Sequence, residues 1–186
     1  MATVTPPKLL TAEEYLLLPK PDRPTELVCG SIVEMNQPGF RHGVVCGVIA
    51  RMLGDFCNDH SLGRVTTNDS GILTQREPDS VRGADVAFYS YQRLPRDQTP
   101  VGYPTVSPEL VFEVLSPDDR WPNVLAKVAE YLSAGVEVVV IVDPESESAH
   151  VYSASPPPTT LEKTDRLEVP NVLPGFSVAI GDLLSD

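Results

Sequence analysis

The segment 136–143, VEVVVIVD, constrains the fold more than any other part of the sequence. An almost unbroken run of apolar, β-branched residues is typical of a strand that is covered on both faces. A helix is predicted directly before it, because Pro122 occupies a first-turn position and Gly135 follows the last residues of the helical pattern. Residues 109–115 predict another strand before that helix. Strand, helix and strand in this order predict a βαβ unit with two parallel strands and a right-handed crossover.

The rest of the chain predicts two more helices and several strands around this unit. Thr11 and Glu14 form a capping-box pattern that opens a short helix through about Leu18. Apolar residues recur at helical spacing from His42 to about His60. Strand signals occur at 25–35, where two short strands flank a turn at Gly30, and at 64–67, 72–75, 84–89 and 150–153. We therefore expect one α/β domain over residues 1–186, with a mixed sheet, a helix on each face, and a C-terminal extension packed on it.

The composition indicates a cytoplasmic protein that has no membrane partner. No apolar run approaches the roughly 20 residues of a membrane-spanning helix, and the N-terminus lacks the basic and apolar regions of a signal peptide. The three cysteines, Cys29, Cys46 and Cys57, are odd in number and include no CxxC pair. This spacing favours buried free thiols over a disulfide framework, or over a structural zinc site with His42 and His60.

The formal net charge of −12 argues against broad, nonspecific avidity for nucleic acid, which depends on the neutralisation of phosphates. Most of the excess acid lies after residue 127, however, in the last part of the chain. A locally positive groove upstream is therefore compatible with the sequence.

Two acids stand in segments that otherwise predict buried strands. Glu113 lies in ELVFEVL and Asp85 lies in GADVAFY. An ionised carboxylate is costly to bury alone, so each needs a partner. Structural ion pairs would satisfy them separately. If the two strands are neighbours, the carboxylates converge, and a divalent metal with oxygen ligands would relieve their repulsion.

The residues around these acids resemble the Uma-type restriction endonuclease family of the PD-(D/E)XK nuclease superfamily. GADVAF resembles the strand that carries its Asp, and PELVFEVLSP resembles its acidic strand and the exit from it. KVAEYLSAGVEVVVIVDP resembles the helix-to-strand segment, and ELVCGSIVEM with Arg41-His42 resembles the N-terminal pattern. The resemblance covers roughly residues 9–153, and it implies a restriction-endonuclease-like mixed β-sheet core flanked by helices.

The sequence departs from the superfamily pattern at two positions. Ala84 stands where the superfamily has Pro, which supplies no ligand. Leu115 stands where the usual Lys follows Glu113 by two residues. Relatives supply this cation from the following helix, so the resemblance makes Lys127 the candidate. The alternative from the helical pattern alone is a solvated surface lysine.

The resemblance implies a metal-dependent endonuclease that hydrolyses phosphodiester bonds of nucleic acid, with DNA as the expected substrate. Asp85 and Glu113 would hold Mg²⁺ or Mn²⁺ together with the backbone carbonyl of Val114. Lys127 would orient the attacking water or stabilise developing charge. Glu26 would be a further metal-site acid and His42 a phosphate contact. Cutting both strands of a duplex would suit a homodimer.

Other functions remain as alternatives. Glu26 would otherwise be an exposed acid on an edge strand, and His42 a surface residue at a helix start. A protein that retained this fold without turnover would bind nucleic acid or another partner. Two carboxylates would also suit a glycosidase, but that activity gives Lys127 no role. The glycine motifs of nucleotide-binding loops and serine hydrolases do not occur.

Overall fold

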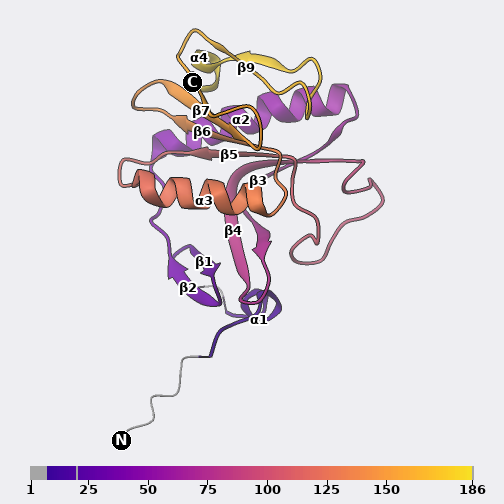
Figure 1. Cartoon of the computed structure of the whole chain (residues 1–186), viewed down its shortest axis with the longest axis vertical. Helices are drawn as coiled ribbons and strands as arrows, with labels where there is room; N and C mark the ends of the chain where they lie inside the picture. The colour runs from indigo at the N-terminus through magenta and orange to yellow at the C-terminus, as the bar shows by residue number, and fades with distance from the viewer. Residues whose placement is uncertain (1–7, 20, 186) are drawn as a thin grey trace, which may run out of the picture.

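A mixed β-sheet with helices on both faces forms the centre of the molecule (Figure 1). The structure is a computed structural model that describes residues 8–19 and 21–185. The strand order is β2-β1-β4-β5-β6-β7-β8, and β3 pairs with β4 off this path. The two long helices are α2 (Phe40–Asp59) and α3 (Trp121–Ser133). This arrangement confirms the predicted mixed α/β fold with flanking helices.

The strands of the sheet are β1 (Thr25–Val28), β2 (Ser31–Glu34), β3 (Gly63–Gln75), β4 (Ser80–Ser90), β5 (Leu110–Val114), β6 (Val138–Asp143), β7 (Ser148–Ser153) and β8 (Thr159–Leu161). The remaining elements are α1 (Ala12–Leu16), β9 (Arg166–Glu168), β10 (Ser177–Ala179) and α4 (Ile180–Leu183). Within the described residues, no helix combines the length and apolar character that a membrane crossing needs.

The predicted βαβ unit is present as β5, α3 and β6. The two strands are parallel and pair from Leu110 opposite Val138 to Val114 opposite Val142. The middle of β6 is fully buried, as its continuous apolar sequence predicts. Pro122 lies in the first turn of α3, and Gly135 follows the helix with a φ of 98°. This positive φ is accessible to glycine without steric cost, and it ends the helix.

Alternation along β5 divides the apolar core into two layers. Leu110, Phe112 and Val114 pack in one cluster with the buried face of α2. Val111, between them, packs in the other cluster with Val128 and Tyr131 of α3. Because side chains alternate across a strand, Glu113 faces the same side as Val111. The strand pattern thus directs this carboxylate towards α3.

Two parts of the prediction need correction. Residues 64–67 and 72–75 belong to one strand, β3, whose pairing with β4 is interrupted by a register shift between Thr67 and Ser70. The extra residues there form a bulge, which preserves the strand while it breaks the apolar alternation. Cys29 is exposed, whereas a buried thiol was expected.

The segment after β7 contributes to the core through short elements without periodicity of their own. Leu167, Val178 and Ile180 are buried in the cluster that contains the apolar face of α2. Arg41, at the start of α2, also donates a hydrogen bond to the carbonyl of Leu184 at 2.7 Å. The C-terminal segment therefore packs against the same helix whose N-terminus lies at the candidate site.

Candidate active site

Asp85 lies where β4 and β5 separate. The ladder between these strands runs from Phe88 opposite Leu110 to Val86 opposite Phe112. At the next position along the ladder, a side chain replaces the backbone carbonyl as hydrogen-bond acceptor. The carboxylate of Asp85 accepts a hydrogen bond from the backbone N–H of Val114 at 2.7 Å. On the other side of β4, the bulge in β3 lies opposite Asp85. The sheet therefore opens around this carboxylate.

Glu113 lies on the neighbouring strand and faces α3. Its two carboxylate oxygens accept hydrogen bonds from the phenol of Tyr131 at 2.8 Å and from the ammonium of Lys127 at 3.0 Å. Burial raises the pKa of the Glu113 carboxyl to about 7; the charge of Lys127 opposes this rise and the charge of Asp85 adds to it. Asp85 and Glu113 are thus close enough for their charges to repel.

Lys127 reaches this centre from the second turn of α3. Its ammonium lies 2.9 Å from the carbonyl oxygen of Gly83, 3.0 Å from Glu113 Oε2 and 3.1 Å from Glu26 Oε1. Its side chain is 18 % exposed, so the stem crosses apolar surface and the charged end points inward. Burial alone would lower the pKa of Lys127, but the carboxylates of Glu113 and Glu26 outweigh that effect and raise it. Lys127 is a buried ammonium rather than a solvated surface lysine.

Glu26 belongs to the same cluster. It is buried on β1, which lies between β2 and β4, so it is not the exposed edge-strand acid of the alternative prediction. One oxygen accepts from the backbone N–H of Gly83 at 3.0 Å, and the other accepts from Arg82 at 2.9 Å. Arg82 also pairs with Glu130 of α3 at 2.6 Å. These contacts fix β1, β4 and α3 around Lys127.

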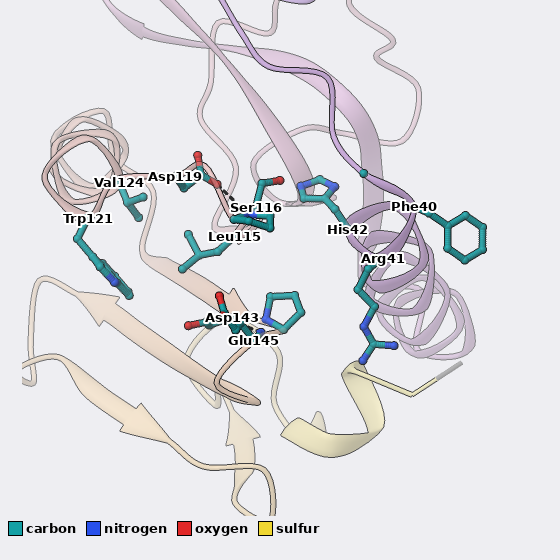
Figure 2. Close-up of a pocket in the computed structure, with 13 residues that line it drawn as sticks. Phe40, Arg41, His42, Leu115, Ser116, Asp119, Trp121, Val124, Asp143 and Glu145 are labelled. Carbon is teal, nitrogen blue, oxygen red and sulfur yellow. Dashed lines mark hydrogen bonds between the residues drawn. The ribbon is translucent and has the colours of Figure 1, made fainter.

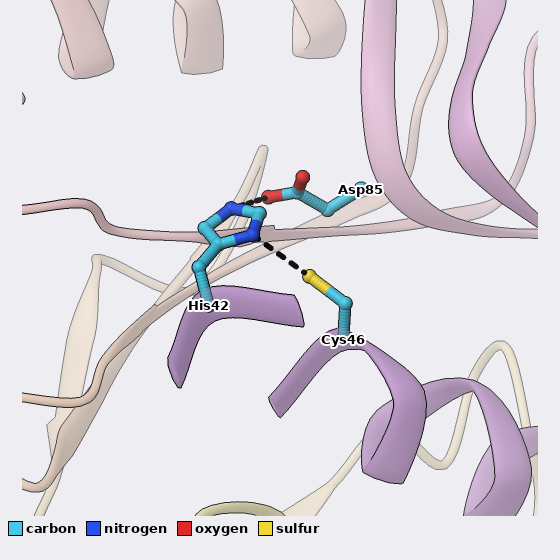
Figure 3. A group of neighbouring side chains, drawn as sticks. All are labelled: His42, Cys46 and Asp85. Atoms are coloured by element: carbon cyan, nitrogen blue, oxygen red, sulfur yellow. Dashed lines mark hydrogen bonds and ion pairs between the residues drawn. The ribbon is translucent and has the colours of Figure 1, made fainter. Parts of the chain in front are cut away.

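His42 approaches Asp85 from the opposite helix, α2 (Figure 3). Its Nε2 lies 3.3 Å from Asp85 Oδ2, and its Nδ1 lies 3.5 Å from the sulfur of Cys46. The side chains of His42 and Asp85 are 12 % and 10 % exposed, respectively. Burial lowers the pKa of His42, but the hydrogen bond and charge of Asp85 outweigh it and raise the pKa overall. His42 is therefore an ion-pair partner of Asp85.

A cavity of about 510 Å³ lies beside His42 (Figure 2). The start of α2 borders one side, and Trp121 and Val124 of α3 border the other. Its floor includes Leu115–Pro117 and Asp143–Glu145, which follow the parallel strands β5 and β6. Ligands of open α/β sheets bind at the carboxyl ends of such strands. His42, the ion-pair partner of Asp85, therefore borders a cavity at the carboxyl ends of β5 and β6.

The sequence interpretation assigned no site role to several residues that the structure brings to this centre. Tyr131 contacts Glu113, and Cys46 contacts His42. The spacing of His42 and Cys46, four residues apart in a helical pattern, was the available signal, because such residues share a helix face. Asp69, in the β3 bulge, has a pKa raised by burial and by the charge of Asp85. Its position depends on the bulge, which the sequence pattern did not predict.

The donor set fits a hard divalent cation. Asp85 and Glu113 offer carboxylate oxygens, which Mg²⁺ and Mn²⁺ prefer as ligands, and each oxygen has two lone pairs. Burial raises the pKa of Glu113 and the charge of Asp85 adds to that rise, so a cation bound beside both carboxylates would favour their charged forms. A separate set of ligand atoms, from His42, Cys46 and Asp85, lies within 4.8 Å of one another.

Comparison with known proteins points to nucleases. Residues 12–181 match the family Uma2, which is described as "Putative restriction endonuclease". The fold is similar to a crystal structure described as a putative nuclease belonging to DUF820 from Anabaena variabilis ATCC 29413, with a TM-score of 0.82 and 20 % sequence identity. That similarity covers 94 % of this chain and 97 % of the other. No curated protein matches the sequence.

Proposed function

Because the chain belongs to the Uma2 family of putative restriction endonucleases, we propose that it is a Mg²⁺- or Mn²⁺-dependent endonuclease that hydrolyses phosphodiester bonds in DNA. The description of the family as restriction endonucleases supports DNA as the substrate. Residues 1–186 act as one domain in this proposal, and a homodimer would let two such sites cut both strands of a duplex. The free thiols support a cytoplasmic location, where cysteines stay reduced.

Asp85 and Glu113 hold the metal in this mechanism, with the backbone carbonyl of Val114 as a third ligand. The bound metal supplies a water of lowered pKa and positive charge beside the phosphate. Neighbouring groups of the chain orient the two carboxylates. The hydrogen bond from the N–H of Val114 fixes the orientation of Asp85, and the phenol of Tyr131 fixes that of Glu113.

Lys127 supplies the cation that is missing at position 115. Its ammonium already lies 3.0 Å from Glu113 Oε2, so it can donate to an oxygen bound beside that carboxylate. There it would orient the attacking water or stabilise charge on the phosphate oxygens in the transition state. The contacts of Glu26 with Lys127 and Arg82 keep the ammonium charged and in place.

His42 contributes a second positive charge on the α2 side. A phosphate that enters along the cavity would meet the imidazole, which borders that cavity and pairs with Asp85. Released from its ion pair with Asp85, the imidazole of His42 would donate a hydrogen bond to a phosphate oxygen. His42 thus acts as a phosphate contact in the loaded site.

The position of the Lys127 ammonium among Glu113, Glu26 and Gly83 O is the observation that carries this proposal. A nuclease of this superfamily pattern needs a cation beside its two acids, and the chain provides one from α3. Ion pairs with Lys127 and His42 satisfy Glu113 and Asp85 separately. The position of both acids where β4 and β5 separate, together with the family match, supports a shared metal site.

A cleavage assay on double-stranded DNA, single-stranded DNA and RNA tests the proposal. We expect wild type to cut DNA in Mg²⁺ or Mn²⁺ and to be inactive in chelator. Asp85→Asn should abolish cleavage. Asp55→Asn is the control, because Asp55 is an exposed acid on α2, and this variant should cleave like wild type. Folded wild type that binds DNA but cleaves none of the substrates in either metal would instead identify a non-catalytic binding protein.

A further inference from the structure

His42 lies between Cys46 and Asp85, with its Nδ1 facing the sulfur and its Nε2 facing a carboxylate oxygen (Figure 3). A nitrogen, a sulfur and a carboxylate oxygen lie within 4.8 Å of one another. His42 and Cys46 are held four residues apart on α2, so they project from the same face of the helix. Asp85 meets them from β4, and its own orientation is fixed by the N–H of Val114. Two rigid elements therefore position all three groups.

This donor set differs in chemistry from the pair formed by Asp85 and Glu113. Mg²⁺ takes oxygen ligands, whereas Zn²⁺ takes nitrogen and sulfur ligands together with carboxylate oxygen. Three protein ligands with a fourth position open to water form a common zinc arrangement. The cavity beside His42 leaves access for that fourth ligand. The three side chains thus match a softer cation than the proposed catalytic metal.

We propose that His42, Cys46 and Asp85 form a Zn²⁺ site that shares Asp85 with the Mg²⁺ site, so that zinc and magnesium exclude each other. The exclusion rests on the function proposed above, because Asp85 is the ligand common to both sites. The oxygen of Asp85 that lies 3.3 Å from His42 also receives the hydrogen bond from Val114, on the β5 side. When the Asp85 carboxylate is oriented towards a zinc ion beside α2, it no longer coordinates a metal ion beside Glu113. Zinc would therefore act as an inhibitor of the nuclease.

Zinc binding is tested first, on metal-free protein without substrate. Calorimetric titration with Zn²⁺ should give one site per chain in wild type. Cys46→Ser should weaken that site by about 100-fold or more, since even partners of metal ligands typically contribute 10- to 100-fold. Cys29→Ser is the matched control, because it removes an exposed thiol elsewhere and should bind zinc like wild type. Equal zinc affinity in wild type and in folded Cys46→Ser would overturn the site.

Cobalt gives an independent readout of the sulfur ligand. Co²⁺ bound by a thiolate has a charge-transfer absorption that oxygen and nitrogen ligands alone do not produce. The band should appear when Co²⁺ is added to wild type and to Cys29→Ser, and it should be absent in Cys46→Ser. A band that persists in Cys46→Ser would assign the sulfur to another cysteine and contradict the proposal.

Repeating the zinc titration at saturating Mg²⁺ tests the exclusion. Zinc affinity should fall, and by reciprocity Mg²⁺ affinity should fall by the same factor when zinc is bound. Unchanged zinc affinity would overturn the proposed exclusion between the two ions. In the cleavage assay, Zn²⁺ should inhibit wild type in Mg²⁺, and Cys46→Ser should resist it. The binding measurements contain no substrate, so they stand even if the protein cleaves no nucleic acid.

Discussion

The ammonium of Lys127 lies 3.0 Å from the carboxylate of Glu113, and the two side chains come from the helix and the strand of the same βαβ unit. The position two residues after Glu113, where a lysine would normally stand, holds Leu115, which packs against the apolar layer under α3. The cation therefore reaches the site from a different element. The charges around Asp85 and Glu113 therefore include a lysine that comes from α3.

The charge of Asp85 should be visible in the titration of His42. We expect Asp85→Asn to lower the pKa of His42, because burial then acts without the carboxylate that raises it. The chain has three histidines, so their ring signals can be assigned in NMR spectra with His42→Gln as reference. A His42 pKa that is the same in both proteins would contradict the ion pair with Asp85.

Glu113 should make the metal-free protein less stable as the pH rises. Its pKa is raised from 4.5 to about 7 in the folded state, so between these values the folded protein holds a proton that the unfolded chain has released. The free energy of unfolding then falls with rising pH across this window, by an amount on the order of 3 kcal/mol. Urea denaturation from pH 4 to 8 should show this slope in wild type.

Glu113→Gln is the comparison for that slope, because the amide retains the shape but does not titrate. Its free energy of unfolding should change less between pH 4.5 and 7 than that of wild type. His42 also has a raised pKa and loses its contribution as the pH rises through that value, so both variants keep a common background slope. Parallel curves for the two proteins would show that Glu113 does not titrate in this range.

Metal removal should reverse a stabilisation that depends on Asp85. A cation that binds only the folded state raises its stability by about 2.7 kcal/mol at a concentration of 100 times Kd. Mg²⁺ should therefore raise the Tm of wild type, and chelator should return it to the metal-free value. The Tm of Asp85→Asn should not respond. An equal response in both proteins would place the bound Mg²⁺ elsewhere.

Arg82 should be a structural support for Lys127. Arg82→Met leaves Glu26 and Glu130 without their guanidinium partner in a cluster where the arginine side chain is 15 % exposed. We expect a loss of about 3–5 kcal/mol in the free energy of unfolding, as for a broken buried ion pair. Arg76 also bridges two carboxylates, but it is 48 % exposed. Arg76→Met should cost about 1 kcal/mol or less. Equal losses would contradict the burial argument.

The features that depend on local residue patterns were predicted most accurately from the sequence. The run in β6 and the boundaries of α3 predicted the βαβ unit, whereas the helical pattern alone favoured a solvated surface position for Lys127. Their position in otherwise apolar strands made Asp85 and Glu113 candidates, and the family resemblance made Lys127 the candidate for the missing cation. Glu26 and His42 were secondary candidates. The structure places Lys127 in contact with Glu113 and Glu26, and His42 in contact with Asp85, while their catalytic roles stay predictions.

What depends on tertiary packing was not predicted. The bulge in β3 brings Asp69 near Asp85, and no periodic pattern marks it. Cys46 was expected to be a buried free thiol because the cysteines are odd in number and include no CxxC pair, and its contact with His42 beside Asp85 depends on the packing of α2 on β4. The strands β8, β9 and β10 are three residues each, too short for a recognisable alternation. Strand β8 is held by its pairing with β7, and β9 and β10 pair with each other and place Leu167 and Val178 in the core cluster.

The most direct test of the account is the cleavage rate of Lys127→Met at saturating Mg²⁺, measured together with its Mg²⁺ affinity. We expect metal binding to remain largely intact and hydrolysis to fall by about two orders of magnitude or more, equivalent to about 3 kcal/mol in the barrier. Lys127→Arg should also be impaired, because a planar guanidinium does not replace a compact ammonium. Lys163→Met, an exposed lysine paired with Glu147, is the control and should cleave like wild type. Wild-type cleavage by folded Lys127→Met would contradict the central claim.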